Sequence, residues 1–185
     1  MIICECEKVE AGNQQRRLHN MEKRQIKVRT DKANYYLNIA EEVSKRGTCI
    51  RNNYGSVIVN NDEVISTGYT GAPRGRVNCS DLGECRRRKN NTPSGAGYEK
   101  CRSVHSEQNA IISASRREMI GATLYLVGIN ARNGEYKENA EPCTLCKRMI
   151  INAGIETVII RVSKTEYNVI KVSSWIDEND DTLKD

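Results

Sequence analysis

One histidine, one glutamate and two cysteines are spaced along the chain as the parts of a metal-assisted hydrolytic site would be. His105 and Glu107 lie two positions apart, and Cys143 and Cys146 lie three positions apart further on. A zinc ion held by one imidazole and two thiolates keeps its fourth position open for water, whereas a structural zinc is closed. The carboxylate is not needed as a ligand, so it is free to carry protons during a hydrolysis.

Two helix starts must converge to bring these groups together. Cys143 and Cys146 are expected in the first turn of one helix, where both sulfurs can face one ion and the positive helix end favours thiolate. A second, short helix is expected to begin near His105 and to present Glu107 from the opposite side. The alternative is a closed structural site with a fourth ligand from elsewhere, but such a site leaves Glu107 unexplained.

Strand and helix patterns alternate along the body of the chain. Asp31 is the expected N-cap of a helix that stops near Gly47. Strands are expected over 56–59 and 64–67, which form a hairpin, then over 122–127, 157–160 and, more weakly, 169–175, with a helix over 142–153. This alternation predicts an α/β fold in which helices cover both faces of a sheet.

Three segments are expected along the 185 residues: an N-terminal arm over 1–30, one domain over 31–176 and an acidic tail over 177–185. Within the domain, the stretch over 70–104 is rich in Gly, Arg, Asn and Cys and shows no clear element. Loops of that length inside a compact domain are normally functional or need a brace. We therefore expect this loop to carry function or to be braced.

The charge and apolar patterns exclude several classes of partner. The net charge of +5 includes seven Lys or Arg against four Glu in residues 1–30, so the body carries little excess charge and does not favour nucleic acid. No apolar run is long enough to span a membrane, and the N-terminus lacks the pattern of a signal peptide. We expect a cytoplasmic protein whose eight cysteines serve metal binding more than disulfides.

Four further cysteines precede the first metal ligand, and two interpretations of them stay open. They are Cys49, Cys79, Cys85 and Cys101. A second, structural zinc held by their thiolates would brace the long loop. Alternatively, some of them are small buried residues of the core.

From about residue 31 to 161 the chain resembles the deoxycytidylate (dCMP) deaminase group of the zinc-dependent cytidine deaminase superfamily. The metal residues fit the H-x-E…P-C-x-x-C signature of zinc-dependent nucleobase deaminases. The flanking segments that carry the resemblance are 46–51, 54–59, 68–75, 93–95, 101–111 and 147–155. The resemblance extends over about two-thirds of the chain.

The resemblance implies a three-layer α/β/α sandwich with a mixed five-stranded sheet. It also implies hydrolysis of dCMP to dUMP and ammonia, which feeds thymidylate synthesis. His105, Cys143 and Cys146 would hold zinc, and Glu107 would move protons. Relatives of this kind are usually oligomers, which implies a homo-oligomer here, and several are activated by dCTP and inhibited by dTTP, with Mg²⁺ accompanying the triphosphate.

The chain departs from the family pattern at two positions. The segment formed by Tyr69, Thr70 and Gly71 resembles the family's Gly-Tyr-Asn-Gly segment, which takes part in regulation, but Thr70 stands where Asn is commoner. Because of this difference, the family's regulatory site and its nearby contacts to the nucleotide sugar do not carry over directly to Thr70. Ser106 replaces the usual Ala.

A nucleotide substrate needs a phosphate clamp, and arginine is the natural bidentate residue for it. The candidates, which lie on loops beside the motifs, are Arg51, Arg74, Arg76 and Arg87. Each of them can equally be an ordinary solvated side chain. The same two interpretations apply to the whole basic run over 86–89, which either neutralises a phosphate or forms a solvated loop.

Two other functions stay open beside dCMP deamination. The same chemistry could act on a free nucleoside, a base or adenosine in tRNA, although the tRNA alternative needs a basic face around the site. A non-catalytic, zinc-braced nucleotide-binding module belongs to a different class. Such a module would have no use for Glu107 as a proton carrier.

Overall fold

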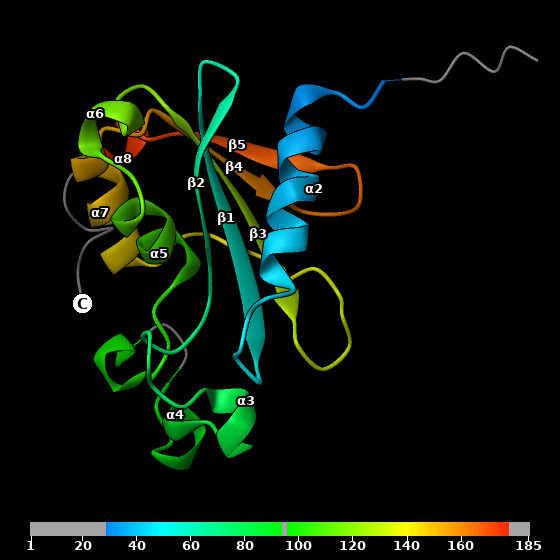
Figure 1. The fold of residues 1–185 in the computed structure, drawn as a ribbon, viewed down its shortest axis with the longest axis vertical. Coiled ribbons are helices and arrows are strands. Elements are labelled where there is room, and N and C mark those ends of the chain that lie inside the picture. The colour runs from blue at the N-terminus through cyan, green and yellow to red at the C-terminus, as the bar shows by residue number, and fades with distance from the viewer. Residues whose placement is uncertain (1–28, 94–95, 178–185) are drawn as a thin grey trace, which may run out of the picture. The chain divides into compact units, whose positions relative to one another are not determined.

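The computed structural model describes residues 29–93 and 96–177 (Figure 1). The chain divides into two units at Asp31, and the second unit holds the elements that follow. The arm expected over 1–30 lies outside the described residues except for its last two, and the acidic tail expected over 177–185 does so except for Asp177. No helix within the described ranges is long and apolar enough to cross a membrane.

A mixed five-stranded sheet in the order β2-β1-β3-β4-β5 forms the centre of the fold. The strands are β1 (Asn52–Asn60), β2 (Glu63–Tyr69), β3 (Thr123–Asn130), β4 (Thr157–Arg161) and β5 (Tyr167–Lys171). β3 and β4 run parallel, and the other neighbouring pairs run antiparallel. The hairpin expected from the sequence is the β1–β2 pair, and the expected fold class is confirmed.

Helices cover both faces of this sheet, which gives the molecule two cores. α2 (Lys32–Ser44) lies on one face, and α5 (Ser106–Ile112), α6 (Arg116–Met119), α7 (Thr144–Ala153) and α8 (Ser173–Asp177) lie on the other (Figure 1). Because side chains alternate along a strand, β1 sends Val57 and Val59 to the α2 core and Ile58 to the other. Asp31 caps α2 as expected, and its Oδ1 accepts a hydrogen bond from the Asn34 backbone N–H at 3.0 Å.

One sequence prediction was wrong near the C-terminal side of the domain. The strand expected over 169–175 ends at Lys171, and Ser173–Asp177 forms α8 instead. Val172 and Trp175 are three positions apart and both buried in the same core. A helical turn satisfies that spacing, whereas a strand would send the two side chains to opposite faces.

The long stretch over 70–104 is more ordered than its sequence predicted. It contains α3 (Cys79–Leu82), α4 (Arg86–Lys89) and a 3₁₀ turn over Tyr98–Lys100. An antiparallel bridge joins its two ends: the Gly71 N–H donates to the Val104 carbonyl at 3.2 Å, and the Val104 N–H donates back at 2.8 Å. The loop therefore closes directly before His105.

Two close backbone contacts determine where α5 and α2 pack on the sheet. A Cβ at Gly68 in β2 would lie 2.2 Å from the carbonyl oxygen of Ser106 in α5. On the opposite face, a Cβ at Gly55 in β1 would lie 2.0 Å from the carbonyl oxygen of Ala40 in α2. Only glycine permits approaches this close, so these two residues fix where α5 and α2 pack.

Candidate metal centre and active-site cavity

His105, Cys143 and Cys146 meet where two helices begin. His105 is the N-cap of α5, Cys143 is the N-cap of α7, and Cys146 follows in the first turn of α7. His105 Nδ1 lies 3.4 Å from the sulfur of Cys143 and 3.4 Å from that of Cys146. The three ligand atoms lie within 4.8 Å of one another, and residues 29–93 and 96–177 hold no other such group of His, Cys, Asp or Glu.

The sharing of protons within this group favours a bound cation. The hydrogen bond with Cys146 lowers the pKa of the Cys143 thiol to about 4, and the hydrogen bond with His105 acts in the same direction. The bond with Cys143, together with burial, raises the pKa of Cys146. Burial lowers the pKa of His105, but hydrogen bonding with Cys143 and the charge of Glu107 outweigh it and raise the pKa. Two sulfurs and one imidazole that lie within hydrogen-bond distance in the protein interior are a set of metal ligands that suits Zn²⁺.

Glu107 is buried directly beside the metal-binding group. Its side chain is 4% exposed, and its carboxylate interacts with the Cys146 thiol. Oε2 of Glu107 accepts a hydrogen bond from Ser106 Oγ at 2.9 Å. The structure thus brings together all four residues that the sequence placed at the centre of the chemistry.

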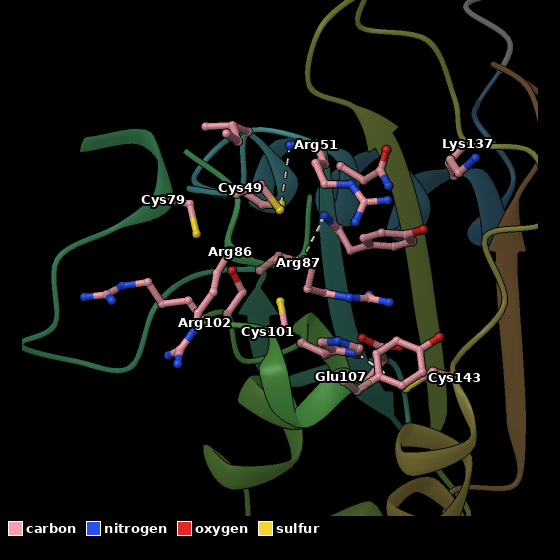
Figure 2. Close-up of a pocket in the computed structure, with 18 of the residues that line it drawn as sticks. Cys49, Arg51, Cys79, Arg86, Arg87, Cys101, Arg102, Glu107, Lys137 and Cys143 are labelled. Carbon is pink, nitrogen blue, oxygen red and sulfur yellow. Dashed lines mark hydrogen bonds between the residues drawn. The ribbon is translucent and has the colours of Figure 1, made fainter. Parts of the chain in front are cut away.

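A cavity of about 430 Å³ opens onto this group, and His105, Glu107 and Cys143 form part of its wall (Figure 2). Other parts of the wall come from the start of β1, the long loop and the segment just before α7. A ligand in the cavity can therefore contact the metal-binding group and the carboxylate at the same time.

Two of the four candidate arginines line the cavity, and two do not. Arg51 and Arg87 are in the wall, and in the view of Figure 2 Arg87 lies between Arg51 and Glu107. Arg74 and Arg76 are exposed and are not among the lining residues. The cavity thus combines a metal-binding group with at least two guanidinium groups.

Arg87 is held firmly in place, so the solvated-loop interpretation of the basic run does not apply to it. Its side chain is only 9% exposed, and its Nη2 donates to the carbonyls of Pro93 at 2.7 Å and Ala96 at 2.5 Å. The guanidinium carbon lies 5.1 Å from the ring centroid of Tyr98, whose ring meets His105 edge-on at 5.4 Å. Arg86, Arg88 and Lys89, the rest of the run, are exposed.

Several lining residues were not predicted from the sequence. They are Ile50, Asn52, Tyr54, Tyr98, Arg102, Ser103, Lys137, Glu138, Asn139 and Glu141. Arg102 follows the predicted residue Cys101, which is a usable signal, and Arg86 belongs to the basic run for which a role with phosphate was one interpretation. The residues over 137–141 gave no such signal, since their segment had the composition of an ordinary polar loop.

Contacts outside the cavity hold that segment against the fold. The Lys137 N–H donates to the Gly128 carbonyl at 2.8 Å, which folds the segment back onto β3. Tyr136 Oη donates to Glu41 Oε2 in α2 at 2.7 Å. The position of Lys137 in the cavity wall therefore depends on residues distant in the sequence.

The segment expected to take part in regulation is divided between the cavity and the surface. Thr70 lines the cavity and is 7% exposed, whereas Tyr69 is 38% exposed and is not in the wall. The Thr70 hydroxyl accepts a hydrogen bond from the Tyr54 backbone N–H at 3.2 Å. Gly71 forms the bridge to Val104.

The four further cysteines all line the same cavity. The sulfurs of Cys49, Cys79 and Cys101 lie on the side of the cavity away from Lys137 (Figure 2). Burial raises the pKa of the Cys79 thiol. Within the described ranges these thiols do not form a ligand group as tight as that of His105, Cys143 and Cys146.

Known proteins resemble this chain in both sequence and fold. The sequence model of the cytidine and deoxycytidylate deaminase zinc-binding region matches residues 30–162. A deoxycytidylate deaminase of Mycobacterium phage D29 is 36% identical over 71% of this chain and 94% of its own length. One of Schizosaccharomyces pombe is 33% identical over 73% of this chain, but the match spans only 37% of that longer protein.

A solved structure supports the same fold. The cytidine deaminase of Burkholderia pseudomallei superposes with a TM-score of 0.50 at 15% identity, covering 78% of this chain and 95% of that one. At this identity the likeness concerns the fold alone. Together with the matched family region and the convergent His-Cys-Cys group, these similarities show that the chain belongs to the cytidine and deoxycytidylate deaminase zinc-binding family.

Proposed function

We propose that this protein hydrolyses dCMP to dUMP and releases ammonia. The observation that carries the proposal is one cavity that opens onto a His-Cys-Cys metal-binding group and a buried carboxylate and is lined by four arginines, among them Arg51 and Arg87. The naming of the 36% identical phage relative as a deoxycytidylate deaminase supports the same substrate. In the overall reaction one water replaces the exocyclic amine of cytosine, and the amine leaves as ammonia.

His105, Cys143 and Cys146 would hold the catalytic zinc, which, when bound, lowers the pKa of a water molecule to about 7. Glu107 would take one proton from that water and pass it to the ring nitrogen next to the amine, and would then take the second proton of the same water and pass it to the leaving amine. Its burial supports this assignment, because a carboxylate shielded from solvent exchanges protons with the bound substrate and not with bulk water. Its contact with Cys146 places it beside the metal-binding group.

Arg51 and Arg87 would bind the phosphate of dCMP. A guanidinium forms two parallel hydrogen bonds to a phosphate, and it loses little entropy when its position is already fixed. Arg87 is fixed by the carbonyls of Pro93 and Ala96, which accept from its Nη2, and it forms part of the cavity wall. Arg86, Arg102 and Lys137 in the same wall add further positive charge.

We also propose that Cys49, Cys79, Cys85 and Cys101 hold a structural zinc that draws their thiolates together. Their convergence on one wall supports this, as does the proximity that lets the other three thiols affect Cys79. Metal analysis should give two zinc ions per chain, and Cys101→Ser should reduce the count to one. A count of one in the unmodified protein would refute this second site.

Regulation by nucleoside triphosphates is a further proposal, which rests on the family resemblance. dCTP with Mg²⁺ would activate the enzyme and dTTP would inhibit it, in a homo-oligomer located in the cytoplasm. Thr70, which stands where the family usually has Asn, is buried, and its hydroxyl accepts a hydrogen bond from the Tyr54 N–H. Kinetics with dCMP that do not change on adding dCTP or dTTP would refute the proposed regulation.

Ammonia release from dCMP by the zinc-loaded protein tests the proposed function. We expect turnover that stops when a chelator removes zinc and returns when zinc is added. Glu107→Gln should keep its zinc and lower kcat by about 10²- to 10⁴-fold, which is the usual contribution of a general acid–base group. A Glu107→Gln variant that retains full activity would refute the assigned role of Glu107.

A further inference from the structure

A chain of buried hydroxyl groups ends on the carboxylate of Glu107. Ser56 Oγ in β1 donates to Ser106 Oγ at 2.8 Å, and Ser106 Oγ donates to Glu107 Oε2 at 2.9 Å. Both serines are 0% exposed. The two hydrogen bonds therefore connect β1, an interior strand of the sheet, to the carboxylate in the active-site cavity.

The order of the two bonds determines where the Ser106 proton points. A hydroxyl group has a single proton to donate. Because the Ser106 oxygen accepts the proton of Ser56, the Ser106 proton is directed to Glu107. Hydrogen bonds arranged in such a chain polarise one another, which strengthens the bond to the carboxylate.

The hydroxyl chain leads into the protein and away from solvent. Ser56 lies in β1, which pairs with β2 on one side and with β3 on the other. A proton on Glu107 therefore cannot reach water through the two serines. The chain instead holds Oε2 of the carboxylate, so it can fix how the side chain of Glu107 meets the cavity that it lines.

We propose that Ser106 is a positioning residue for Glu107 and that Ser56 orients Ser106. This inference rests on the proposed function, which gives Glu107 its proton-carrying role. Catalytic groups must be held within about 0.5 Å of the productive geometry. Since Ser106 stands between His105 and Glu107 in the first turn of α5, one helix start places the metal ligand, the positioning hydroxyl and the carboxylate.

Steady-state kinetics of serine variants test the inference. Ser106→Ala should lower kcat for dCMP about 10-fold, the effect of losing a hydrogen bond to a charged group, with KM and zinc content unchanged. Ser56→Ala should lower kcat by a smaller factor. The double variant should match Ser106→Ala alone, because Ser56 acts through Ser106. In a Glu107→Gln background, Ser106→Ala should not change the dissociation constant of dCMP.

Thermal unfolding separates positioning from packing. Ser106→Ala leaves the Ser56 hydroxyl buried without its acceptor, so Tm should fall; the double variant removes that group and should recover Tm but not kcat. Ser66→Ala is the matched control, because buried Ser66 donates to the Ala110 carbonyl of the same helix at 2.8 Å. This control should lower Tm and leave kcat unchanged.

Two results would overturn the inference while leaving the proposed function in place. One is a Ser106→Ala variant whose kcat stays within about two-fold of that of the unmodified enzyme. The other is a double variant in which kcat recovers together with Tm. A zinc-loaded, unmodified protein that does not convert dCMP at all is a distinct outcome, which refutes the proposed function and with it the role given to Ser106.

Discussion

The metal-binding end of the cavity and its arginine-lined end are built in different ways. His105 and Cys143 are the N-caps of two helices, and Glu107 and Cys146 lie in their first turns, so local chain geometry sets most of the mutual positions. Arg87, in contrast, is held by two carbonyls and an aromatic ring of an irregular loop. The residues of the reaction are therefore positioned by their spacing in the sequence. The arginine proposed to recognise the substrate is positioned by contacts within the long loop over 70–104.

This difference predicts two kinds of variant. A change to His105, Glu107, Cys143 or Cys146 should strongly lower turnover of every substrate, because all substrates need the same metal and proton carrier. A change in the loops should alter the preference among substrates and leave the metal in place.

The largest effect is expected for Cys146→Ser. A serine hydroxyl is a poor zinc ligand, so the variant should lose the catalytic zinc and all measurable turnover of both dCMP and deoxycytidine. Metal analysis and ammonia release provide the measurement, and Leu145→Ser, at an exposed neighbouring position of α7, is the control. Retention of the full zinc content by Cys146→Ser would contradict the assigned ligand set.

A smaller and more selective effect is expected for Arg87→Gln. Loss of a charged hydrogen-bond donor to phosphate should lower kcat/KM for dCMP by about 10- to 100-fold, while kcat/KM for deoxycytidine, which has no phosphate, should not fall. Comparing the two substrates on the same variant cancels any loss of folded protein. Arg74→Gln, an exposed arginine outside the cavity wall, should change neither value. Equal losses of kcat/KM for both substrates would contradict the proposed role of Arg87 in phosphate recognition.

The smallest effect is expected for Tyr136→Phe, which removes the hydrogen bond to Glu41. Burial raises the pKa of Glu41, but hydrogen bonds with Tyr136 and Lys164 outweigh it and lower the pKa. A lowered carboxyl pKa contributes stability above the pKa of the unfolded chain, and this contribution is lost as pH falls through the folded-state pKa. Tyr136→Phe should therefore be about 1 kcal/mol less stable at pH 7, with a smaller difference in acid. Denaturant unfolding at several pH values gives the measurement, and a difference that grows as pH falls would contradict it.

The sequence predicted the metal-binding end residue by residue because helix starts have recognisable local rules. The spacing of His105 and Glu107, and that of Cys143 and Cys146, specifies positions at helix ends without knowledge of the rest of the fold. The alternation of elements likewise predicted the layered sheet. The prediction of a strand over 169–175 was wrong because Trp175 is buried in the core, and this tertiary contact favours a helical turn.

The arginine-lined end could not be predicted in the same way. Arg87 and its exposed neighbours Arg86 and Arg88 are identical residue types in one run, and only the contacts with Pro93, Ala96 and Tyr98 distinguish Arg87. Lys137 reaches the cavity because its segment folds back on β3 and Tyr136 bonds to Glu41 in α2. Such long-range contacts leave no periodic pattern in the sequence.

The ratio of kcat/KM for dCMP to kcat/KM for deoxycytidine tests the central claim most directly. It should be measured by ammonia release on the zinc-loaded protein, since the two substrates differ only in the phosphate. The two guanidinium groups proposed to bind the phosphate, those of Arg51 and Arg87, predict a ratio of about 100 or more in favour of dCMP, because losing the phosphate leaves those charged groups without their partner. A ratio near or below one, with rapid turnover of deoxycytidine, would contradict the claim that this cavity is built for a nucleotide.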